Sequence, residues 1–163
     1  MERFITWLAR LQLAIGTLAL VIFVAATLLQ VLARYLNISV LWTEEVAVNA
    51  FIWAIFSGAA VMVREKKHFS FNALAMKLSG RTRLALVLFE QSVMLVFCVL
   101  CAFYSVEITD TFWHSKWVTL PSLQQGYVWL VLPVSFATSS LYLLEGMLKE
   151  IRVCVKREKP VWS

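Results

Sequence analysis

Long apolar runs separated by short charged segments dominate the sequence. Residues 11–33 and 46–63 contain no charge, 84–106 contain one, Glu90, and 117–144 contain none. At about 1.5 Å per residue, a helix of such length crosses a hydrocarbon core of about 30 Å. Because no water is present there, backbone amides must bond within a helix. The pattern predicts an all-α integral membrane protein with one domain, 1–163, and four spans at about 11–33, 46–63, 84–106 and 126–144.

Composition supports the same class. The chain is 61% apolar and 15% charged, with a mean hydropathy of +0.77, whereas soluble domains are about 45–50% apolar and about 25% charged. Three cysteines in 163 residues do not make a disulfide framework. These values exclude a soluble enzyme, a secreted disulfide-rich domain and a nucleic-acid-binding domain.

The positions of the basic residues predict the orientation. Of the 15 lysines and arginines, all except Arg34 and Lys116 lie in the two tails or between the second and third spans. Lys and Arg accumulate on the cytoplasmic side, so we expect a multi-pass membrane protein with both termini in the cytoplasm. The first run is longer than the roughly 7–15 residues of a signal-peptide core, so we expect it to remain as a span.

The connecting segments predict contacts at both membrane surfaces. On the cytoplasmic side, apolar positions at helical spacing predict a short amphipathic interfacial helix at about 71–79. The basic residues near the inner boundary are expected to bind phospholipid phosphates; this group comprises Arg64, Lys66, Lys67, His68 and Lys77. On the outer side, Trp113, Lys116 and Trp117 are typical either of an aromatic belt or of a docking surface for an external partner.

Candidate chemistry is sparse. Glu90 lies about 9 Å inside the third span, where it is either a proton or ion relay or a structural carboxylate, protonated or bonded to Gln91, Ser92 or Arg83. Cys98 and Cys101 are interpreted as small apolar residues, because desolvation disfavours a thiolate there. The two histidines fall on opposite sides of the membrane. We therefore expect no catalytic residue, no metal site and no cofactor, and Pro133 is expected to kink the fourth span.

Small residues recur along the spans and predict close helix packing. Ala19, Ala26 and Ala33 repeat every seven residues, Ala47, Ala50, Ala54 and Gly58 line the second span, and Ser135 and Ser139 lie one turn apart. Small residues let helix backbones approach in lipid, where the hydrophobic force between helices is absent. Since the spans show no polar pathway wide enough for a solute, the pattern favours a membrane scaffold.

One motif resembles a known family. Trp42-Thr43-Glu44-Glu45 is similar to the Trp-x-Glu-Glu that opens the second span of the small (Q-type) permease subunit of tripartite ATP-independent periplasmic (TRAP) transporters. Gly58, Arg64, the segment from His68 to Leu74, and Leu132-Pro133-Val134 resemble later parts of the same pattern. Asn72 departs from it, since aspartate is frequent there.

The resemblance implies a subunit without its own transport path. In such systems a large multi-span permease moves the substrate with sodium by an elevator motion, and a periplasmic binding protein delivers an organic anion such as a sialic acid or a C4-dicarboxylate. The small subunit would pack against the fixed scaffold of the large one and help to receive the binding protein. Trp42, Glu44 and Glu45 would lie at the outer interface, where the acids meet either Arg34 or a basic group of a partner. Gly58, Glu90 and Pro133 would be subunit-interface or structural residues.

A second class of function stays open. Four helices also permit a self-sufficient, proton-coupled carrier that works as a homodimer with Glu90 as its coupling carboxylate. The position of Glu90 near one membrane face and the length of the cytoplasmic segments argue against it. A membrane thiol oxidase would need paired cysteines in an outer loop, and the outer loops contain none.

Overall fold

The computed structural model describes residues 2–65 and 81–158. Its helices are α1 (Glu2–Tyr35), α2 (Trp42–Arg64), α4 (Arg81–Thr111), α5 (Gly126–Trp129) and α6 (Val131–Glu158). In the described ranges, α1, α2, α4 and the α5–α6 segment are long and apolar enough to span a membrane. The predicted all-α membrane fold with four spanning segments is confirmed. The expected interfacial helix at 71–79 lies outside the described residues, as do Lys66, Lys67, His68 and Lys77.

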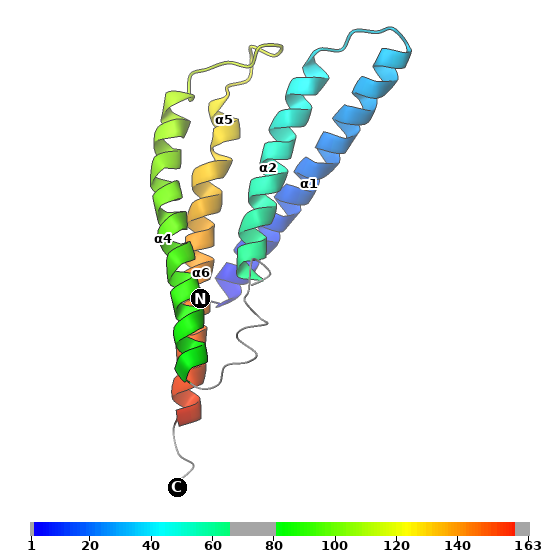
Figure 1. Ribbon diagram of the computed structural model, residues 1–163. Coiled ribbons are helices and arrows are strands. Elements are labelled where there is room, and N and C mark those ends of the chain that lie inside the picture. The colour runs from blue at the N-terminus through cyan, green and yellow to red at the C-terminus, as the bar shows by residue number, and fades with distance from the viewer. Residues whose placement is uncertain (1, 66–80, 159–163) are drawn as a thin grey trace.

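Two antiparallel helix pairs form the molecule (Figure 1). Helices α1 and α2 make a hairpin, α4 packs along α6, and α6 also contacts α2. The start of α1, the end of α2 and the end of α6 lie toward one end, which we call the inner end, and the turn after α1 and the loop after α4 lie at the other, outer end. The hairpin leans away from the α4–α6 pair toward the outer end. Helix α6 is therefore the element that joins the two pairs.

Small side chains make the contact between α1 and α2. Ala19, Ala26 and Ala33 are each at most 7% exposed, as expected from their seven-residue spacing. At Gly16 a Cβ atom would lie 3.0 Å from the Cβ of Ser57, so the two backbones approach closely there. This is the packing that helices use in lipid, and the prediction of close packing along α1 is confirmed.

A compact turn reverses the chain after α1. Asn37 has a φ of 56°, a left-handed conformation that asparagine tolerates better than most residues. The N–H of Ile38 donates to the carbonyl of Ala33 over 2.9 Å, which satisfies one of the carbonyls that a helix end leaves free. The turn thereby positions the start of α2 at the outer end.

The last spanning segment is interrupted near Pro133, where the sequence predicts a kink. The break lies at Leu130, between α5 and α6. Proline has no N–H to donate to the carbonyl four residues earlier, which belongs to Trp129. The hydroxyl of Thr109 on α4 donates to that carbonyl over 3.2 Å and shares this donation with the carbonyl of Ser105, at 2.7 Å. A neighbouring helix thus compensates for the bond that Pro133 removes.

Apolar side chains cover much of the outward surface. Leu18 and Leu32 on α1 and Phe89, Val96 and Phe103 on α4 are each more than half exposed. Such faces suit lipid tails or another membrane subunit, whereas the contacts between helices use mostly small and hydroxyl side chains. The helices therefore pack through mostly small and hydroxyl side chains, and their outward faces are apolar.

Candidate functional site

The outer end of α2 brings together the acidic motif and the loop that follows α4. Thr43 is fully buried, and its hydroxyl donates to the carbonyl of Val40 over 2.7 Å, which fixes the entry into the helix. Glu44 and Glu45 occupy the first turn, where the helix dipole stabilises negative charge. The two carboxylates point to different environments, because Glu44 is exposed and Glu45 is half-buried.

Glu45 holds the outer loop. Its carboxylate accepts hydrogen bonds from the N–H of Val118 over 2.8 Å, from the N–H of Thr119 over 2.9 Å and from the Thr119 hydroxyl. Backbone bonds within the loop then fold it back on itself, since the N–H of Gln125 donates to Ser115 over 2.7 Å and Lys116 pairs with Gln124. Hydrogen bonds to a charged acceptor are stronger than neutral ones. One side chain therefore links α2 to a loop more than 70 residues later.

A shallow pocket of about 360 Å³ lies between this helix end and the loop. Its walls combine exposed apolar side chains, both glutamates and two amides: Leu41, Glu44, Glu45, Val48, Asn49, Val118, Thr119 and Gln125. Asn49 is only 6% exposed, and its side-chain nitrogen has no hydrogen-bond partner among the described residues. A buried N–H without an acceptor is costly, so Asn49 places an unpaired donor beside the pocket.

Local neutralisation of Arg34 is not observed. Arg34 is exposed at the end of α1, and within the ranges 2–65 and 81–158 it forms no ion pair with Glu44 or Glu45. Glu45 uses its carboxylate for the loop instead. Trp42, at the start of α2, is 42% exposed.

The three residues considered for external docking differ in environment. Trp113 is part of the packing, since its ring lies 5.9 Å from that of Tyr127 and a Cβ atom at Gly126 would lie 2.8 Å from its Cα. Trp117 is half-buried, whereas Lys116 is exposed. Val118, which the sequence did not single out, is 89% exposed. Of these residues, Lys116 and Val118 are the exposed ones, and Trp113 anchors the loop.

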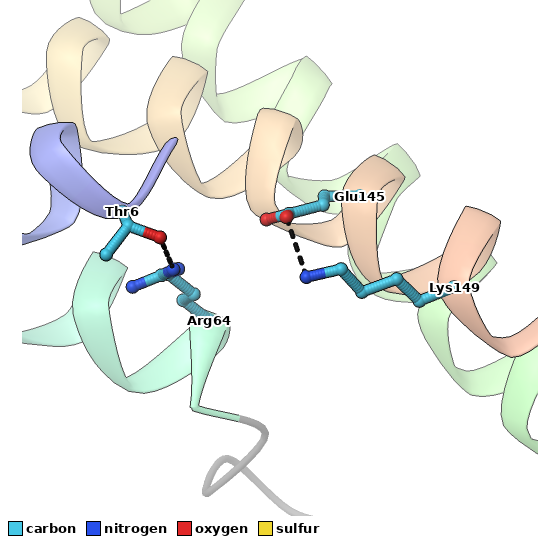
Figure 2. A network of polar contacts seen from close by, with 4 residues as sticks. All are labelled: Thr6, Arg64, Glu145 and Lys149. Atoms are coloured by element: carbon cyan, nitrogen blue, oxygen red, sulfur yellow. Dashed lines mark hydrogen bonds and ion pairs between the residues drawn. The ribbon is translucent and has the colours of Figure 1, made fainter. Parts of the chain in front are cut away.

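Polar contacts lie at the inner end, one of them between α1 and α2 and another within α6 (Figure 2). The Arg64 guanidinium donates to the Thr6 hydroxyl over 2.7 Å, and the Lys149 ammonium lies 2.8 Å from the Glu145 carboxylate. Arg64 lies at the end of α2 and has a partner on α1. Thr6 was not predicted, because a contact between residues 58 positions apart has no local sequence signal. Glu145 was also not singled out, although its partner Lys149 lies four residues later on the same helix.

A buried hydrogen-bond chain joins α1 to α6. The amide nitrogen of Gln12 donates to the Thr138 hydroxyl and the Tyr142 hydroxyl donates to the amide oxygen of Gln12, both over 3.1 Å. All three residues are less than 10% exposed. A search for charges alone overlooks Gln12, and the signal that finds it is an uncharged polar residue inside an apolar span.

The remaining predicted residues lie apart from these clusters. Glu90 is half-buried on α4 and has no bond to Gln91, Ser92 or Arg83 in the part of the chain that the structure describes. The expected local pairing of Glu90 is therefore absent there. A Cβ atom at Gly58 would meet no atom within 4 Å, so this side of α2 is open.

Comparison with models of known protein families identifies one family that this chain matches. The model of one family, described as "Tripartite ATP-independent periplasmic transporters, DctQ component", matches residues 23–153. The match includes α2, α4 and α5, most of α6 and the last part of α1, from residue 23, and with them the outer pocket and its loop. A comparison with curated proteins gives no match.

Proposed function

Since the chain belongs to the family of the DctQ component of TRAP transporters, we propose that it is the scaffold subunit that packs against the large permease subunit of a sodium-coupled importer. The family assignment makes it a transporter component. The scaffold role is our proposal, and the observation that carries it is the family match across all four spanning segments.

Three features of the helices support a scaffold role. The helix contacts are closed by small residues and by the hydrogen bonds of Gln12, which suits a rigid body. The outward faces of α1 and α4 are apolar, as a partner inside the membrane requires. The open side of α2 at Gly58 lets a helix of the large subunit approach closely.

The energy source and the cargo are further parts of the proposal. A transporter that concentrates its substrate without ATP can draw on an ion gradient, and we propose sodium. We further propose an organic acid anion, of the sialic acid or C4-dicarboxylate class, delivered by a periplasmic binding protein. The residues that select the solute would then belong to the other two components.

We propose an inner-membrane location with both termini in the cytoplasm. In this orientation Arg64 at the end of α2 lies near the cytoplasmic lipid headgroups, where phosphate binding is favourable. The loop held by Glu45 faces the periplasm and is available to the binding protein.

Purification and transport assays test the scaffold role. An affinity-tagged chain should co-purify with a much larger multi-span subunit, and liposomes with the isolated chain should show no uptake. Liposomes with both membrane subunits should take up the anion only with the binding protein and a sodium gradient. Uptake by the isolated chain would contradict the proposal. Solute-driven proton flux through the isolated chain that is lost in Glu90→Gln would instead establish a proton-coupled carrier.

A further inference from the structure

We propose that the outer pocket between α2 and the loop is a docking site for a lysine or arginine of the periplasmic binding protein. This inference rests on the proposed function, because it presumes that the chain is part of the assembled transporter. Neither the fold nor the helix packing requires these pocket residues, and the proposal gives them a role in binding a partner.

The chemistry of the walls selects a basic residue on an extended segment. The exposed carboxylate of Glu44 has no partner among the described residues, whereas Glu45 is occupied by the loop. A guanidinium or ammonium group can pair with Glu44. Asn49 offers a buried N–H without an acceptor, which a backbone carbonyl next to the basic residue can satisfy. The exposed side chains of Leu41, Val48 and Val118 suit the methylene stem.

Charge around the pocket favours a soluble, basic partner. Besides the two glutamates, Glu107 and Asp110 lie exposed in the last turns of α4, and among the described residues of this end the lysines and arginines are Arg34 and Lys116. Acidic groups outnumber basic groups here, so the surface attracts a positively charged region and speeds its association.

The position of the pocket distinguishes this partner from the large subunit. A permanent contact inside the membrane is expected to use apolar and small side chains. The carboxylate of Glu44 is exposed beside the outer loop. Such a group suits a contact that forms and dissociates in water. We therefore assign the pocket to the binding protein.

The test uses the two membrane subunits assembled in lipid nanodiscs and the purified binding protein of the same transporter. Affinity is measured at low and high salt for the original complex and for Glu44→Gln, Asn49→Leu and Glu107→Gln. Glu107→Gln is the matched control, because it removes an exposed carboxylate at the same end that does not line the pocket. Co-purification of both membrane subunits is checked for each variant.

We expect Glu44→Gln to weaken binding about tenfold and to reduce its salt dependence. Asn49→Leu should weaken binding several-fold without loss of thermal stability, because it removes a buried donor that has no partner within the chain. Glu107→Gln should change binding less than twofold.

Three results would overturn the assignment. Unchanged binding in both pocket variants would exclude this contact, and equal losses in Glu44→Gln and Glu107→Gln would reduce it to a general field effect. Failure of the pocket variants to co-purify with the large subunit would assign the pocket to that subunit. If the original chain itself did not co-purify, the proposed function would fail instead, so the two failures are distinguishable.

Discussion

At the scale of single residues, neighbouring side chains of one motif have different tasks. The Trp-x-Glu-Glu pattern predicted that both acids lie at the outer interface, but it did not indicate their partners. Glu45 binds backbone N–H groups of Val118 and Thr119, and such a contact depends on how α2 and the loop meet in space. Only the fold brings them together, so sequence reasoning singled out Glu45 but did not predict its role.

The role of Glu45 predicts a local change in dynamics. Glu45→Ala should speed hydrogen exchange of the Val118 and Thr119 amides about tenfold, because each loses a hydrogen bond to a charged acceptor. Amide exchange followed by mass spectrometry on the purified protein measures this. Glu44→Ala removes the neighbouring carboxylate, which has no bond to the loop, and should leave exchange there unchanged. Equal acceleration in both variants would mean that charge near the helix end, and not these bonds, orders the loop.

At the scale of helices, charge-free runs were sufficient to find the spans. The helices are nevertheless longer than the runs, since α1 begins at Glu2 and α6 ends at Glu158. Charged residues terminate an apolar run, yet they are compatible with helix where the chain leaves the hydrocarbon. Pro133 predicted a kink in the last span, but it did not predict the group that compensates for the break at Leu130. A proline shows which N–H is missing and not which donor replaces it.

The compensation by Thr109 predicts a coupling between α4 and the last segment. Thr109→Val should lower the free energy of unfolding by about 1 kcal/mol, since the carbonyl of Trp129 loses its donor. In a Pro133→Ala background the restored N–H can bond to this carbonyl, so the same substitution should cost clearly less. Thermal unfolding of the four proteins in detergent completes the cycle. Thr111→Val controls for the loss of a hydroxyl that bonds only within α4, to Glu107, and additive effects of the first two changes would contradict the coupling.

At the scale of the whole molecule, the sequence was most informative about class and least about partners. Hydropathy alone determined an all-α membrane fold, because lipid leaves the backbone few alternatives. The surfaces that meet other subunits are apolar, like those that meet lipid, and residues such as Leu18 and Phe103 carry no mark that separates the two. That the chain is part of a larger assembly is inferred from the family match and not from the residue pattern of these faces.

Orientation is a property of the whole molecule that the basic residues predict. Lys116 lies in the outer loop and Arg152 near the end of α6, so they should face opposite compartments. With Cys98, Cys101 and Cys154 replaced by alanine, a membrane-impermeant maleimide should label Lys116→Cys in intact cells and Arg152→Cys only after lysis. The reverse pattern would place the Glu45-held loop in the cytoplasm. The pocket would then be out of reach of any periplasmic protein, so this labelling decides whether docking at Glu44 is geometrically possible.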